Sequence, residues 1–188
     1  MNLFELKHRR DLGEFLNAKN LTGIGAEIGV AYGENANAIL EKWRGSGMFL
    51  VDPWNREKCG EYIDGSASID FDGAYNYCIS LVSRYPGRTI VLRKTSDEAL
   101  RDIPDGFLDF AYIDGNHHDP QVSRDINGWF KKVKSGGILG GHDYYDLDTD
   151  HYKCDVKSAV DRFVKNRGLW LHTTTEDQLD MSWWTMVP

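Results

Sequence analysis

The chain has 188 residues, of which 41% are hydrophobic and 27% are charged, and this composition predicts one globular domain over residues 1–188. Its formal net charge of −7 argues against a broad basic surface for nucleic acid, because such binding depends on neutralising phosphates. We see no signal peptide and no apolar run long enough to span a membrane, so we expect a cytoplasmic protein with no membrane partner.

Apolar, β-rich segments alternate with helical patterns along the chain. This order predicts an α/β fold: a Rossmann-like, doubly wound, mostly parallel sheet with helices on both faces. We expect an N-terminal helix over about 3–18, within a segment 1–20, and later helices over 35–43, 74–85, 121–133 and 153–166. The seven strands are expected at 24–28, 48–51, 89–92, 108–113, 137–140, 169–174 and 182–187. The last two, separated by a short polar stretch, predict an antiparallel C-terminal hairpin.

The irregular segment 53–72 is rich in Gly, Ser and Asp and is long for a connection within a compact domain. We expect it to form a lid over a binding site, since long loops often carry function. Its Trp54, Tyr62, Asp64 and Asp70 suit a polyhydroxylated molecule, although an exposed acidic loop is the commoner meaning of such a run.

A glycine-containing turn follows the first predicted strand, in Gly25-Ala-Glu-Ile-Gly-Val-Ala-Tyr-Gly33. Gly29 and Gly33 allow the backbone to approach a ligand where any Cβ would intrude. The spacing differs from the dinucleotide fingerprint, and Glu27 stands just before the turn. A carboxylate there repels a pyrophosphate but suits an ammonium or sulfonium group. The turn therefore disfavours NAD, and a purely structural turn is the alternative.

Polar residues follow five successive predicted strands, at the sheet edge where open α/β folds bind ligands. Asp52 ends the second strand and is placed to accept hydrogen bonds from ribose hydroxyls. Trp54 is a candidate to stack on an adenine, and Ser96 or Asp97 a candidate to bind its amino group. The alternatives are a turn role for Asp52, simple packing for Trp54 and a helix N-cap at Ser96.

Asp114 and Asp143 end neighbouring strands, so we expect their carboxylates within a few ångströms of each other. Their repulsion requires a cation or a proton, and oxygen ligands suit Mg²⁺. His117, three residues after Asp114, is a candidate general base. Because His118 and His142 are near in sequence, a transition-metal site stays open, as does a polar cluster without metal.

These motifs resemble the class I S-adenosylmethionine-dependent methyltransferases across almost the whole chain. Glu27-x-Gly29-x-x-x-Gly33 matches that family's cofactor loop, and Asp52 matches its ribose-binding acid. Tyr112-Ile-Asp-Gly-Asn-His117 and Lys134-Ser-Gly-Gly-Ile-Leu-Gly-Gly-His-Asp143 look like later motifs of one branch. That branch holds the small metal-dependent O-methyltransferases, similar to catechol and macrolide-sugar O-methyltransferases.

The resemblance implies O-methylation of a small hydroxylated acceptor, with S-adenosylmethionine as cofactor and His117 and Asp114 as catalytic residues. It implies Mg²⁺ at Asp114 and Asp143, but Tyr144 stands where the branch has a third ligand, and a neutral phenol binds Mg²⁺ poorly. The cofactor-binding residues that it implies are Glu27, Gly29, Gly33, Asp52, Trp54, Ser96 and Asp114. A metal-independent methyltransferase and a non-catalytic cofactor-binding module are the alternatives, and homo-oligomerisation is left open.

Overall fold

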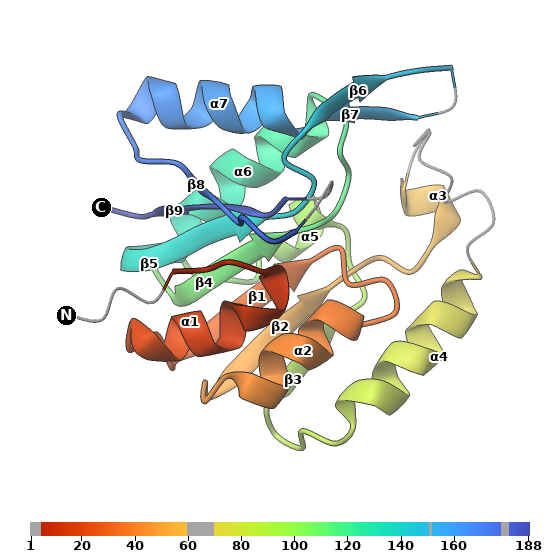
Figure 1. Ribbon diagram of the computed structural model, residues 1–188. Helices are drawn as coiled ribbons and strands as arrows, with labels where there is room; N and C mark the ends of the chain where they lie inside the picture. The colour runs from red at the N-terminus through yellow and green to blue at the C-terminus, as the bar shows by residue number, and fades with distance from the viewer. Residues whose placement is uncertain (1–4, 60–69, 151, 178–180) are drawn as a thin grey trace.

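The computed structural model describes residues 5–59, 70–150, 152–177 and 181–188, and its centre is a seven-stranded sheet (Figure 1). The strand order is β3-β2-β1-β4-β5-β9-β8. Strands β1 to β5 are parallel, whereas β9 is antiparallel to both β5 and β8. The strand bounds are β1 Ile24–Ile28, β2 Gly47–Val51, β3 Thr89–Leu92, β4 Leu108–Ile113, β5 Val133–Gly141, β8 His172–Thr173 and β9 Trp183–Met186. The predicted mostly parallel sheet with a C-terminal hairpin is confirmed.

Helices cover both faces of this sheet (Figure 1). One face carries a 3₁₀ turn η1 (Arg9–Asp11) and the helices α1 (Leu12–Ala18), α2 (Glu34–Lys42) and α4 (Phe71–Val82). The other carries α5 (Ser96–Ala99), α6 (Gln121–Lys132) and α7 (Val156–Arg167). A short helix α3 (Arg56–Cys59) follows β2.

Strand β4 shows why the two layers form. All six of its residues are buried, as expected for a central parallel strand that has helices on both sides. Its side chains alternate: Phe110 and Tyr112 pack with α1 and α2, while Ala111 and Ile113 pack with α6 and α7. The sheet therefore separates two hydrophobic clusters, and its strand ends form the edge on which the site is built.

Two predicted helices begin later than expected. The helix expected over 3–18 is wrong over the described residues 5–8, because the His8 side chain caps η1 and the Lys7 carbonyl accepts hydrogen bonds from the distant Thr175 and Glu176. The helix expected from residue 153 begins at Val156. Residues 153–155 instead form β7, which pairs with β6 (Asp146–Asp148) in a second hairpin that was not predicted.

The predicted lid over 53–72 lies largely outside the described residues, since 60–69 are not described. The flanking parts are α3 and the start of α4, whose N-cap is Asp70. The lid stays a prediction.

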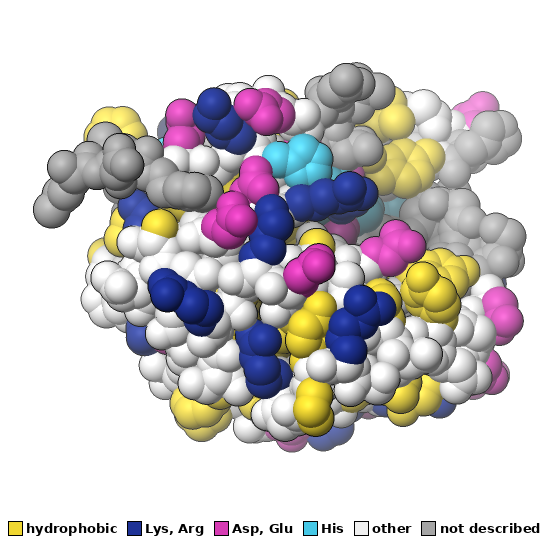
Figure 2. Space-filling model, turned by 60° about the horizontal axis from the view of Figure 1, so that its bottom comes forward, with side chains coloured by type: hydrophobic (Ala, Val, Ile, Leu, Met, Phe, Trp, Pro, Cys, Tyr) yellow, Lys and Arg dark blue, Asp and Glu magenta, His cyan; other side chains and the backbone are white. Residues whose placement is uncertain are grey.

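The surface and the helix lengths bear on the expected partners. Among the described residues, we find no helix of the length and hydrophobicity needed to cross a membrane. Figure 2 shows acidic and basic side chains interspersed over one face, in keeping with an overall net charge of −7.

Candidate active site

The glycine turn after β1 is in close contact with the residues that follow β4. Gly29 has a φ of 84°, and a Cβ added to it would lie 2.0 Å from the carbonyl oxygen of Asp114. Gly33 has a φ of 79°, and a Cβ there would lie 2.7 Å from the Cys78 sulfur. Only glycine meets both the backbone angle and the close approach at position 29. The turn, which we call the Gly29 cradle, therefore packs directly against the backbone of Asp114, where a Cβ at Gly29 would clash.

Asp52 braces this cradle from the end of β2. Its Oδ2 accepts hydrogen bonds from the backbone of Val30 at 3.0 Å and Ala31 at 2.9 Å, and its Oδ1 accepts one from Trp54 at 2.7 Å. Burial raises the pKa of Asp52 above its ordinary value, although these three hydrogen bonds oppose the shift. A carboxylate has about four acceptor positions, so one remains for a ligand.

The Trp54 ring is 1% exposed and its indole nitrogen donates to the carbonyl of Ala31 at 2.8 Å. It also makes an edge contact with Tyr75, at 5.2 Å between ring centroids. Trp54 thus packs under the glycine turn while it lines the cavity beside it. Adenine stacking on this ring stays a prediction.

A cavity of about 610 Å³ opens beside the cradle. Of the residues predicted to bind cofactor or act in catalysis, it is lined by Gly29, Asp52, Trp54, Ser96, Asp97, Asp114 and His117. Glu27 and Gly33 are not among the residues that line it.

Ser96 is tied to a buried acid on the cavity wall. Its Oγ donates to Asp125 at 2.5 Å and accepts from the indole of Trp129 at 2.8 Å, and Gln121 donates to the same Asp125 oxygen at 2.9 Å. Burial raises the pKa of Asp125 to about 6. Sequence reasoning missed Asp125. The available signal was an acid on the apolar stripe of the helix, between Val122 and Trp129.

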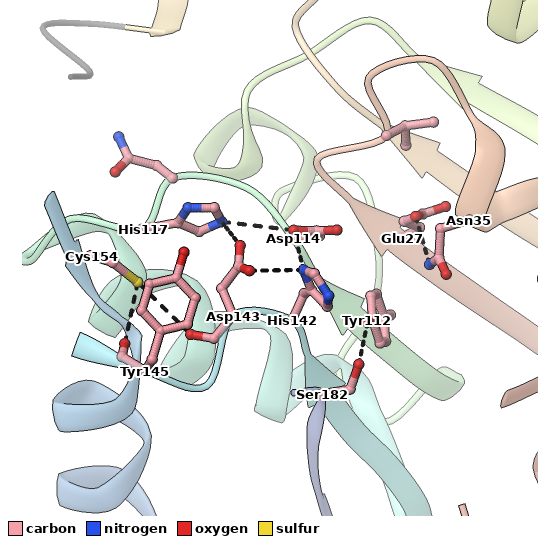
Figure 3. Close-up of polar contacts among 12 residues, drawn as sticks. Glu27, Asn35, Tyr112, Asp114, His117, His142, Asp143, Tyr145, Cys154 and Ser182 are labelled. Carbon is pink, nitrogen blue, oxygen red and sulfur yellow. Dashed lines mark hydrogen bonds and ion pairs between the residues drawn. The ribbon is translucent and has the colours of Figure 1, made fainter. Parts of the chain in front are cut away.

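Two histidines bracket Asp143 at the ends of β4 and β5 (Figure 3). His117 Nε2 lies 3.1 Å from Asp143 Oδ2, and His142 Nδ1 lies 3.0 Å from Asp143 Oδ1. Both rings are 3.7 Å from Asp114 Oδ1. Donor atoms of Asp114, His117 and Asp143 all lie within 4.8 Å of one another. The strand order therefore brings together the two acids and the histidine that the sequence singled out.

The charged groups in this cluster shift one another's pKa values. Burial raises the pKa of Asp143, but the hydrogen bond from His142 and the nearby positive charges outweigh it and hold that pKa below its ordinary value. Burial lowers the pKa of His142, but Asp143 and Asp114 outweigh it and raise that pKa. The two acids thus favour a positive charge beside them.

Tyr144 points away from this cluster. Its hydroxyl donates to Asp161 of α7 at 2.6 Å, and Lys157 lies 5.4 Å from its ring centroid. Burial and Asp161 raise the pKa of Tyr144 to about 12. Tyr144, which stands where a third metal ligand was expected, thus bonds α7. His117 is the third possible donor, together with Asp114 and Asp143.

The β6–β7 hairpin contacts His117 through its backbone and through Tyr152. Asp155 donates its backbone N–H to the His117 carbonyl at 2.8 Å, and Tyr152 Oη lies 3.4 Å from His117 Nδ1. Tyr152 in turn contacts Tyr145 Oη at 2.9 Å. Sequence reasoning missed Tyr152, because the two strands beside it have only three residues each, too few for a periodic signal.

Glu27 lies on the opposite side of Asp114 from His117 (Figure 3). It is 1% exposed, and its Oε1 accepts a hydrogen bond from Asn35 at 2.9 Å. Its Oε2 is buried and has no hydrogen-bond partner. Burial raises the pKa of Glu27 to about 8. A buried carboxylate oxygen without a partner is costly, so it indicates a place for a ligand donor.

Arg9 reaches the cluster from the N-terminal segment. Its Nη1 lies 3.2 Å from His142 Nε2 and 4.0 Å from Asp114 Oδ2. No local motif marked this residue, because the contact spans 133 positions of sequence.

Backbone strain gathers at the same edge of the sheet. Ala31, Trp54 and Asp143 have φ values of 46°, 39° and 53°, a region that residues other than glycine rarely adopt. Such strain persists where the surrounding structure enforces it, and it concentrates at functional sites.

Residues 26–144 match the family described as methyltransferase domain. The chain is 26% identical over 128 residues to an uncharacterized protein, y4gI, of Sinorhizobium fredii, a match that covers 68% of this chain and spans 13% of that relative. The fold is similar to an O-methyltransferase from Bacillus cereus in complex with S-adenosylhomocysteine (TM-score 0.65, 12% identity, 95% of this chain and 80% of that one).

A precorrin-6y C5,15-methyltransferase from Geobacter metallireducens is similar as well (TM-score 0.61, 13% identity, 94% of this chain and 86% of that one). At these identities the structural likeness shows the fold, while the family match covers most of the chain and takes in both the glycine turn and the acid–histidine cluster. The chain belongs to the methyltransferase-domain family and has the class I S-adenosylmethionine-dependent methyltransferase fold.

Proposed function

We propose that the protein transfers the methyl group of S-adenosylmethionine to a hydroxyl oxygen of a small molecule, such as a sugar or natural product. The observation that carries this proposal is the meeting of two features at one sheet edge. The Gly29 cradle and the unpartnered Glu27 oxygen lie on one side of Asp114, and the His117–Asp143 pair lies on the other.

The described residues fit the cofactor. Gly29 lines the cavity, its missing Cβ lets the turn pack against the Asp114 backbone, and Glu27 Oε2 has acceptor capacity for an ammonium group. Asp52 would bind the ribose with its remaining acceptor position, while Trp54 and Ser96 would contact the adenine in the adjoining cavity. The fold is shared with a structure that contains S-adenosylhomocysteine.

S-adenosylmethionine supplies a sulfonium-activated methyl group, so the protein chiefly aligns the acceptor with that methyl. Positioning of this kind can supply ~7–11 kcal/mol of the barrier. His117 accepts the hydroxyl proton as the oxygen attacks, and the electron pair of the broken C–S bond leaves on sulfur. The Asp143 carboxylate, 3.1 Å from His117 Nε2, stabilises the protonated ring.

Asp114 and Asp143 would hold a hard divalent cation through carboxylate oxygens, and its charge would lower the pKa of an acceptor hydroxyl. The same histidine nitrogen cannot both bind that cation and take the proton. A metal-independent reaction is the second candidate. It is favoured by Arg9, whose positive charge already lies 4.0 Å from Asp114 Oδ2.

The experiment is transfer of a labelled methyl group to a panel of hydroxylated sugars and natural products, with Mg²⁺ or with EDTA. We expect product with at least one acceptor. If activity needs Mg²⁺, Asp114→Asn and Asp143→Asn should abolish the Mg²⁺ response. Full activity after chelation would refute the metal site, and absence of transfer to any acceptor class would count against the proposed reaction.

A further inference from the structure

We infer that Arg9 binds the carboxylate at the amino-acid end of S-adenosylmethionine, opposite the ammonium group that Glu27 receives. This inference rests on the proposed function and assigns a cofactor-binding role to a residue outside the family match, which begins at residue 26.

The N-terminal segment is fixed in place at Arg9. The Arg9 backbone N–H donates to Asp177 Oδ2 at 3.0 Å, and His8 Nε2 lies 3.0 Å from Asp177 Oδ1. Thr175 and Glu176 donate to the Lys7 carbonyl at 3.0 and 2.9 Å. Asp177 is nearly buried, with a side chain 6% exposed. Residues 7–9 are thus attached to the segment 175–177, and the Arg9 guanidinium lies near His142 and Asp114 at the strand ends.

Arg9 and Glu27 occupy the same face of the sheet. Glu27 contacts Asn35 of α2, and η1 leads directly into α1, which packs beside α2. Asp114 lies between them, because its Oδ2 is 4.0 Å from Arg9 Nη1 and its charge acts on Glu27. The Ser96–Asp125 wall of the cavity belongs to the opposite face, with α5 and α6. If the nucleoside of S-adenosylmethionine bound at that wall, the amino-acid end of the cofactor would extend toward Glu27 and Arg9.

At the amino-acid end of the cofactor, the carboxylate of S-adenosylmethionine needs a positively charged partner. Glu27 suits the ammonium group, but Asp114 and Asp143 would repel a carboxylate placed beside it. The facing groups are those two acids, Glu27, His142 and Arg9. The Arg9 Nη1 contacts His142, and a guanidinium has five donors in a planar fork that pairs with carboxylates. The half-exposed Arg9 side chain therefore offers the complementary charge.

The test uses two ligands that differ in the group Arg9 would bind. S-adenosylhomocysteine carries the amino acid, whereas methylthioadenosine keeps the nucleoside and thioether and lacks it. Calorimetric titrations are made with wild type, Arg9→Ala and Arg9→Lys. Arg10→Ala is the matched control, because Arg10 is the adjacent, exposed arginine. Thermal unfolding checks that each variant is folded.

We expect Arg9→Ala to weaken S-adenosylhomocysteine binding by roughly 10–100-fold, the range for a charged hydrogen bond, and to change methylthioadenosine binding by less than about threefold. Arg9→Lys should fall between Arg9→Ala and wild type, and Arg10→Ala should match wild type. An equal loss for both ligands, or no loss for either, overturns the inference. Wild type that binds neither ligand overturns the proposed function itself, which separates the two failures.

Discussion

The two halves of the site are built in different ways. The cofactor half, the turn over residues 27–33 together with Asp52 and Trp54, is made of neighbouring residues held by backbone hydrogen bonds. The acceptor half joins the ends of β4 and β5 to Tyr152, through contacts between side chains that are distant in sequence. The cofactor half thus rests on local backbone geometry, whereas the acceptor half depends on contacts between distant segments.

The family match covers parts of both halves. Residues 26–144 include the glycine turn, Asp52 and Trp54 together with Asp114, His117 and Asp143, but they exclude Arg9 and the β6–β7 hairpin. A precorrin methyltransferase and an O-methyltransferase both share the fold, so the fold leaves the acceptor undetermined. We expect this chain's acceptor preference to lie in the β6–β7 hairpin, which is outside the match.

His117→Ala separates the two halves most strongly. Loss of a general base typically costs roughly 10²–10⁴-fold in turnover, and the cofactor half does not depend on this ring. We expect that loss in methyl transfer to the acceptor found by the panel, with S-adenosylhomocysteine affinity unchanged in titration calorimetry. Wild-type turnover in the variant would remove His117 from the base role.

Gly29→Ala should damage the cofactor half. The left-handed backbone costs an alanine roughly 1–2 kcal/mol, and the contact with the Asp114 carbonyl adds ~1–3 kcal/mol. We expect denaturant unfolding to show the summed loss and calorimetry to show weakened S-adenosylhomocysteine binding. Gly87→Ala is the matched control, since Gly87 has a φ of 78° with no atom within 4 Å of the new Cβ. Equal effects of the two substitutions would contradict the cradle.

Glu27→Gln tests the buried acid through pH. The folded state raises the pKa of Glu27 from 4.5 to about 8, so it keeps a proton that the unfolded chain releases. Glu27 therefore costs no stability below pH 4.5, and the cost grows as pH rises to about 8, where it is complete. We expect wild type to lose on the order of 5 kcal/mol relative to Glu27→Gln across this window.

Urea unfolding at a series of pH values measures that difference. Glu41→Gln is the control, since Glu41 is exposed on the same helix α2. Parallel pH profiles for wild type and Glu27→Gln would show that the carboxylate is not held neutral by burial.

Tyr144→Phe should have the smallest effect. Its hydroxyl bonds Asp161 on α7, so the variant loses one hydrogen bond, worth ~1 kcal/mol in unfolding free energy. Turnover and any Mg²⁺ response should stay at wild-type levels. A tenfold fall in turnover would place the phenol in the acceptor half after all.

The sheet and the cofactor half were predictable because their signals are local. Strand β4 is a mostly apolar, fully buried run. Gly29 is required by a positive φ and by the close contact with the Asp114 backbone. The meeting of Asp114 with Asp143 followed from parallel strands whose ends share one edge.

The rest depended on contacts between distant segments. Lys7 pairs with Thr175 and Glu176, which makes residues 5–8 part of an interface and not a helix. Three-residue strands in the β6–β7 hairpin carry no periodicity, and their position follows from packing over His117. The sequence showed that Tyr144 stands at the position of a third ligand, but not where its side chain lies: Asp143 has a left-handed φ, and Tyr144 bonds Asp161 of α7.

The central claim is that the Gly29 cradle and Glu27 form an S-adenosylmethionine site, and its most direct test is thermal unfolding with added S-adenosylhomocysteine or NAD⁺. A ligand that binds only the folded state at 100 times its Kd stabilises by about 2.7 kcal/mol. We predict a rise in Tm with S-adenosylhomocysteine and none with NAD⁺. Stabilisation by NAD⁺ alone, or by neither ligand, would contradict the claim.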